Sequence, residues 1–116
     1  MNQSTENPNL SHEKKLLDVI AANPEITQRE LSDELGLSLG KTNFVLKALI
    51  DRGLVKVENF KRSNNKMGYA YLLTPQGVSE KVKITKRFLV RKMAEFDQLK
   101  AEIENLQEEV SKEWIR

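Results

Sequence analysis

The stretch from Gly36 to Phe44, GLSLGKTNF, places glycines beside a lysine and a threonine, a combination that can bind phosphate. It contains Gly-Lys-Thr, the end of the nucleotide-binding P-loop G-x-x-x-x-G-K-[ST], whose backbone amides cradle phosphates. Here only three residues separate Gly36 from Gly40, and an amphipathic helical pattern precedes them instead of a buried strand. A loop one residue short cannot wrap its amides around a phosphate in that geometry. The spacing therefore argues against nucleotide binding.

The same residues fit a helix-turn-helix. Thr27 with Glu30 three residues later is a capping box that opens one helix, and Gly36 is a typical helix end. Ser38 is then positioned to cap a second helix, which Gly53 closes. In this motif the second helix reads the DNA, so the phosphates in question would be those of a duplex.

The helical period divides this second helix into two faces. Thr42, Leu46 and Leu49 form a stripe that we expect to face the core. On the opposite face, an asparagine can donate and accept at an adenine edge, and a lysine can reach guanine or phosphate. Phe44 on that face would either contact a thymine methyl group or pack against a neighbouring loop. The predicted recognition-helix residues are Ser38, Gly40, Lys41, Asn43, Phe44 and Lys47.

Further DNA contacts are expected on both sides of this helix. Gln28 and Arg29 begin the preceding helix, which crosses the DNA backbone in this motif, so we predict phosphate contacts there. The segments LVKVENF and YAYLLT flank a polar, basic turn and predict a β-hairpin. Its tip would enter a minor groove or clamp the backbone. The predicted wing residues are Lys61, Arg62, Asn64, Asn65 and Lys66.

The charge distribution supports a polyanionic partner. The net charge of the whole chain is only +2, but residues 38–73 carry seven basic and two acidic side chains. Residues 74–94 carry six basic and one acidic side chain, whereas the two ends of the chain are acidic. Positive charge is thus concentrated where the helix-turn-helix and hairpin are expected.

These elements predict a mostly α protein with a small β-hairpin (α+β). Residues 1–10 are polar and aperiodic, which predicts a disordered N-terminus. Residues 11–74, with Ser11 as the first N-cap, would form a winged helix-turn-helix domain. Residues 75–116 would form a long C-terminal coiled-coil helix that starts at the N-cap Thr74 and Pro75.

The long helix carries an apolar heptad repeat. About three heptads are clean, which is the usual threshold for a coiled coil. We therefore predict a homodimer whose interface comprises Leu89, Phe96, Leu99, Ile103, Leu106 and Val110. A parallel pair would place Glu95 opposite Lys100 of the second copy, and an antiparallel pair would oppose glutamates. That single pair leaves the orientation open.

Several classes of function are not expected. The chain has no cysteine and one histidine, and it shows no carboxylate pair or nucleophile–base arrangement, so we expect no enzyme, metal site or cofactor. No signal peptide or membrane-spanning run is visible, and the absence of cysteine fits a reducing cytoplasm.

An alternative to DNA binding is a winged-helix module that uses its helices and coiled coil to hold other proteins. The basic hairpin favours DNA.

Residues 13–110 resemble the small bacterial MarR-type regulators associated with exopolysaccharide gene clusters. The most specific parts of the likeness are SLGKTNFVLKALIDRGLVKVENF and GYAYLLTPQG. The resemblance implies a bacterial, cytoplasmic, dimeric transcription factor in which residues 38–47 lie in the recognition helix and residues 61–66 lie in the wing. Larger MarR proteins form a ligand pocket with an N-terminal helix. The short segment before Ser11 argues against a small-molecule effector here.

Overall fold

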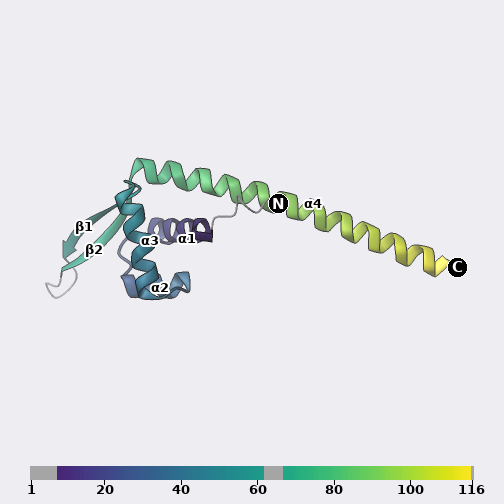
Figure 1. The fold of residues 1–116 in the computed structure, drawn as a ribbon, viewed down its shortest axis with the longest axis horizontal. Helices are drawn as coiled ribbons and strands as arrows, with labels where there is room; N and C mark the ends of the chain where they lie inside the picture. Colours follow the sequence, from purple (N-terminus) through teal and green to yellow (C-terminus); the bar gives the residue numbers. More distant parts are fainter. Residues whose placement is uncertain (1–7, 62–66, 116) are drawn as a thin grey trace. The chain divides into compact units, whose positions relative to one another are not determined.

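The computed structural model describes residues 8–61 and 67–115. Three helices, α1 (Pro8–Ala22), α2 (Gln28–Leu35) and α3 (Leu39–Asp51), precede two strands and a last helix (Figure 1). The strands β1 (Val55–Lys61) and β2 (Met67–Leu73) pair antiparallel, and α4 spans Pro75–Ile115. The predicted fold class, with a hairpin and a long C-terminal helix, is confirmed. The chain divides into two compact units, residues 1–84 and 85–116.

The first helix begins earlier than the sequence indicated. α1 begins at Pro8, so Ser11 lies inside the helix, and the N-cap predicted at Ser11 is wrong. Proline fits a first helical turn because its φ is already helical and its missing N–H would have no partner in the helix there. Of the segment predicted to be disordered, residues 8–10 are helical and residues 1–7 lie outside the described residues.

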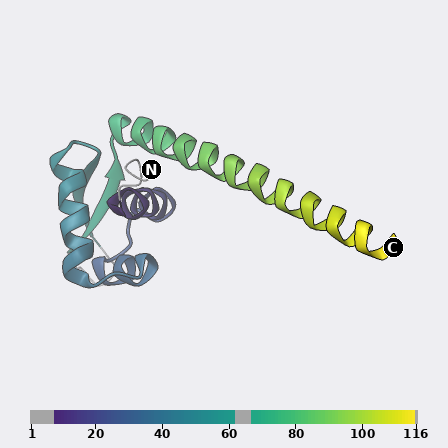
Figure 2. The ribbon, with the colours of Figure 1, turned by 45° about the vertical axis from the view of Figure 1, so that its right-hand side comes forward.

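The core of the first unit lies among its three short helices and the hairpin. In both views α3 lies beside the hairpin (Figures 1 and 2), and α1 contacts α2, α3 and β2. Leu16, Leu17 and Ile20, which share one face of α1, are fully buried. Ile84, which lies outside the apolar heptad positions of α4, is also fully buried. Burying side chains of this size contributes about 1.5–3 kcal/mol each.

Hydrogen bonds fix the first turn of α4 at the start of the hairpin. The Thr74 amide donates to the Leu54 carbonyl at 3.0 Å, and the Thr74 hydroxyl donates to the Gly53 carbonyl at 2.5 Å. The same hydroxyl accepts from the Gly77 amide at 3.0 Å. Thr74 and Pro75 therefore open the helix as predicted.

Ion pairs connect the first turns of α4 to the rest of the unit. The Arg52 guanidinium lies 3.2 Å from the Glu13 carboxylate and 3.9 Å from that of Glu80. Lys81 Nζ lies 3.3 Å from Asp18 Oδ1.

Among the described residues, none of the helices is long and apolar enough to cross a membrane.

Candidate nucleic-acid interface

The turn between α2 and α3 has the predicted caps. The Thr27 hydroxyl accepts from the Glu30 amide at 3.1 Å, and Glu30 Oε1 accepts from the Thr27 amide at 3.0 Å, which completes a capping box. Gly36 ends α2 with φ 69°, a left-handed conformation that glycine adopts without steric cost. Ser38 then caps α3 by accepting from the Lys41 amide at 3.1 Å. Two helices joined by a turn this short form a helix-turn-helix.

The two faces of α3 differ sharply in burial. Thr42 and Leu49 are fully buried, and Val45 and Leu46 are nearly so. On the other face, all six predicted recognition-helix residues are exposed: Ser38, Gly40, Lys41, Asn43, Phe44 and Lys47. The core stripe thus leaves a continuous face that carries amide, ammonium and aromatic groups.

Two apolar side chains interrupt this polar face. Phe44 is 65% exposed, so no loop among the described residues covers it; packing against such a loop was one of the two roles expected for it. Leu39, which the sequence did not single out, is 47% exposed in the first turn of α3. Its position directly after the N-cap Ser38 could have indicated from the sequence that this side chain is exposed. Both side chains can contact apolar groups such as a thymine methyl.

Lys47 has a weak intrahelical partner. Its Nζ lies 3.9 Å from Asp51 Oδ2, and the two side chains are 74% and 65% exposed. An ion pair this exposed stabilises the helix by at most about 0.5 kcal/mol. Lys47 can therefore exchange this carboxylate for another anion at little cost.

The two residues predicted to contact phosphates at the start of α2 differ in their surroundings. Arg29 is exposed, whereas Gln28 is half-buried and its Nε2 donates to the Tyr71 hydroxyl at 3.3 Å. The Tyr71 amide in turn donates to the Pro24 carbonyl at 2.8 Å. Tyr71 is 4% exposed and connects the hairpin to the segment before α2. The strand pattern of YAYLLT did not reveal this contact.

The base of the wing is described and its tip is not. Lys61 is the last residue of β1, opposite Met67. The other predicted wing residues, Arg62, Asn64, Asn65 and Lys66, lie outside the described residues. Nearer the base, Lys56 Nζ lies 3.3 Å from Glu58 Oε2 on the same strand, so this lysine is locally compensated.

Residues 9–56 match the family model described as winged helix-turn-helix DNA-binding. The chain carries a winged helix-turn-helix domain. The match spans α1, α2, α3 and the start of β1, which are the elements that position the exposed face of α3. Among curated protein sequences, none matches the chain.

Solved structures share the fold of the winged helix-turn-helix domain. A PadR-like transcriptional regulator from Bacillus cereus matches with a TM-score of 0.69 at 18% identity, over 80% of this chain and 97% of its own. A Staphylococcus aureus MarR in complex with salicylate and kanamycin matches with a TM-score of 0.58 at 23% identity, over 75% and 57%. Identities this low establish the fold alone.

A third structure contains DNA. Streptococcus pneumoniae FabT in complex with DNA has 26% identity and a TM-score of 0.51, over 72% of this chain and 59% of its own. Structures described as a PadR-like regulator and as MarR are thus among those that resemble this chain.

Proposed function

We propose that this protein is a transcriptional regulator that binds specific sequences of double-stranded DNA as a homodimer. The observation that carries the proposal is the outer face of α3. Lys41, Asn43 and Lys47 are exposed there, directly opposite a fully buried stripe. An α-helix that presents such side chains after a helix-turn-helix turn fits the major groove, where base pairs have distinct donor and acceptor patterns.

The charge of the domain supports the same role. Residues 38–73 carry seven basic and two acidic side chains, which favours a polyanion at this part of the chain. Asn43 and Lys47 would read bases, whereas Lys41, Arg29 and Gln28 would contact phosphates. For Gln28, such a contact would compete with its hydrogen bond to Tyr71.

The homodimer and the regulated genes complete the proposal. The exposed apolar row on α4 supports pairing through the C-terminal helix. The likeness of GYAYLLTPQG and its flanks to exopolysaccharide-associated regulators supports genes of that kind as targets. The protein would act in the bacterial cytoplasm, where its DNA lies.

Selection of bound fragments from the source genome tests this function. The full-length protein is mixed with fragmented genomic DNA at about 0.15 M salt, and the retained fragments are sequenced. We expect a two-fold symmetric site bound at least about 10³-fold more tightly than random DNA. Recovery of fragments with no shared sequence would contradict sequence-specific binding.

One observation favours a second candidate, a module that binds other proteins. Phe44 and Leu39 are exposed on the face assigned to DNA, and exposed aromatic residues are common in protein interfaces. The same selection separates the two functions, because a protein-binding module would retain DNA no better than its charge alone dictates.

A further inference from the structure

The part of α4 from Thr85 onward carries a row of exposed apolar side chains. Phe96 is 64% exposed, Leu99 54% and Ile103 46%, so residues 8–61 and 67–115 leave the row uncovered. In heptad notation, positions a of this row are Leu89, Phe96, Ile103 and Val110, and positions d are Leu99 and Leu106. A row at a and d is the interface of a coiled coil.

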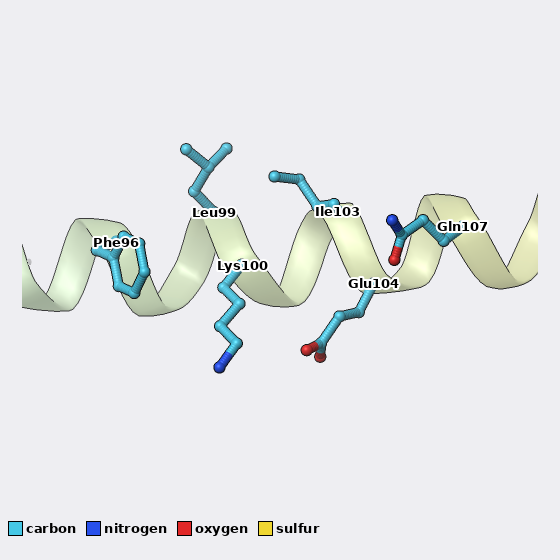
Figure 3. A pocket seen from close by; sticks show the side chains of 6 residues that line it. All are labelled: Phe96, Leu99, Lys100, Ile103, Glu104 and Gln107. Atoms are coloured by element: carbon cyan, nitrogen blue, oxygen red, sulfur yellow. The ribbon is translucent and has the colours of Figure 1, made fainter.

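The row is hollowed where a facing side chain would enter. A hollow of about 330 Å³ is lined by Phe96, Leu99, Lys100, Ile103, Glu104 and Gln107 (Figure 3). Figure 3 shows Leu99 and Ile103 projecting side by side, with Lys100 and Glu104 forming the other wall. Four of the lining residues occupy successive a, d, e and a positions. In a parallel coiled coil, four such residues form the hole that receives a side chain at d.

We propose that a second copy of α4 covers this row in parallel and in register, so that Leu99 of the second copy fills the hollow. The proposal rests on the proposed homodimer and adds its orientation. It follows from the residues at positions g and e, which flank the row. In a parallel pair, each g residue faces the e residue five positions later on the other helix.

The parallel arrangement gives these flanking residues suitable partners. Glu95 at g faces Lys100 at e, an opposite-charge pair. Phe88 at g faces Met93 at e, so two apolar side chains outside the a and d row meet. Met93 is 58% exposed in the single chain, whereas Phe88 is half-buried and the Arg91 guanidinium lies 4.5 Å from the centroid of its ring. Pairing therefore buries apolar area beyond the row itself.

An antiparallel arrangement opposes like charges. There g faces g, and the g residues from 95 onward are Glu95, Glu102 and Glu109. With Leu99 opposite Phe96 of the second copy, Glu95 faces Glu102 and Phe88 faces Glu109. Moving the register by one heptad in either direction still opposes glutamates, because the g positions of this half of the helix are uniformly acidic.

Two lysines would lie in unfavourable positions in a parallel pair, but each already has a carboxylate partner in its own chain. Lys81 at g would face Lys86 of the second copy, but Lys81 Nζ lies 3.3 Å from Asp18 Oδ1 of its own chain. Lys92 occupies a d position, but its side chain is 70% exposed and its Nζ lies 3.2 Å from Glu95 Oε1. A long lysine stem can lie along the seam while its ammonium stays in water.

Orientation decides where the DNA-binding elements lie. Each winged domain precedes its own α4 in the chain, so parallel pairing brings both domains to the same end of the paired helices. Antiparallel pairing would place them at opposite ends. If both domains then bind one DNA duplex, the two half-sites should lie about 34–36 Å apart or a multiple of that distance.

Charge reversal at Glu95 distinguishes the two orientations. Glu95→Lys would face Lys100 in a parallel pair and Glu102 in an antiparallel pair. We expect the dimer dissociation constant, measured by sedimentation of the full chain, to rise about 5- to 30-fold, since two Glu95–Lys100 pairs are reversed per dimer. Lys92 also loses its carboxylate partner in this variant, so the orientation is read from the rescue that follows. Adding Lys100→Glu should restore the dissociation constant. The matched control is Asp97→Lys at position b, which makes the same charge change away from the row. Tighter association of Glu95→Lys, or a loss of association that Lys100→Glu does not reverse, would overturn the parallel assignment.

Disulfide cross-linking provides a second readout, because the chain has no cysteine of its own. Glu113→Cys at position d should form a disulfide-linked dimer in a glutathione buffer, and Lys112→Cys at position c should not. In the antiparallel register described above, residue 113 lies opposite residue 82, roughly 45 Å from its counterpart. A mixture of Glu113→Cys and Val82→Cys chains that yields only the mixed disulfide would overturn the inference.

The outcomes separate this inference from the proposed function. A sedimenting dimer that fails both orientation tests contradicts the parallel pairing and leaves the homodimer standing. A wild-type chain that sediments as a monomer at tens of micromolar contradicts both the pairing and the dimer. Fragment selection then reports independently on DNA binding.

Discussion

The Cα of Gly77 lies directly against the backbone carbonyl of Leu54. A Cβ built on Gly77 would overlap the Leu54 oxygen and lie 3.0 Å from the carbonyl carbon. Because the Thr74 amide donates to the same oxygen, the carbonyl cannot move without breaking that hydrogen bond. The first turn of α4 can therefore reach the start of β1 only if residue 77 has no side chain.

Gly77→Ala should destabilise the winged domain by about 1–3 kcal/mol, the cost of forcing a methyl group into a packed site. Chemical denaturation followed by circular dichroism measures the change. Gly40→Ala is the matched control: it also lies in a helix, but a Cβ there has nothing within 4 Å. It should stabilise α3 by roughly 0.5–1 kcal/mol. If Gly77→Ala and Gly40→Ala changed the stability equally, the overlap with the Leu54 carbonyl could not be the reason for glycine at position 77.

Thr42→Val should stabilise the domain by about 0.5–2 kcal/mol. Thr42 is fully buried, and its Oγ1 has no hydrogen-bond partner among the described residues. Valine has nearly the same shape and removes the cost of burying that hydroxyl. The measurement is the free energy of unfolding, with unchanged DNA affinity as the control for an intact fold. A less stable variant would show that the hydroxyl has a partner in solution.

Asn43→Ala should weaken binding to the preferred site by about 1–3 kcal/mol and affect random DNA much less. The reason is that an amide at this exposed position of α3 can pair with a base edge. Titration by fluorescence anisotropy against both DNAs gives the comparison. Lys15→Ala, on the exposed surface of α1, is the control and should change neither affinity. Equal losses on both DNAs would assign Asn43 to positioning rather than base recognition.

Lys61→Ala with Arg62→Ala should weaken binding to all sequences alike. If these wing residues each neutralise a phosphate, the slope of log affinity against log salt should fall by about 1–2. Titrations at several salt concentrations measure the slope, again with Lys15→Ala as the control. An unchanged slope would place the wing outside the interface.

Leu99→Glu with Ile103→Glu should give a monomer whose winged domain remains folded. The two side chains line the hollow on α4, and charges buried there would have no partners. The monomer should lose the second half-site and keep mostly non-specific affinity. Sedimentation and a DNA titration of the same sample measure both effects. Ala101→Glu with Asn105→Glu adds the same charge on the opposite side of the helix and should remain dimeric. A persistent dimer in the first variant would show that the interface lies elsewhere.

Much of the fold could be predicted because its signals are local. The capping box of Thr27 and Glu30, the glycine after α2 and the apolar stripe of α3 each arise from residues within a few positions of one another. Such patterns determine helix bounds and faces before any long-range contact forms. The same locality explains the error at Ser11, where a plausible cap competed with Pro8 and the earlier start prevailed.

The sequence by itself determined the order of the elements, the exposed face of α3 and the heptad row of α4, since each follows from a short repeat. The tertiary structure alone decided which distant groups meet. It placed Gly77 against Leu54, the Tyr71 hydroxyl within reach of Gln28, and Ile84 in the core although it lies off the heptad row. Such contacts depend on how the elements pack, because two residues 20 to 45 positions apart carry no shared period that would predict their distance.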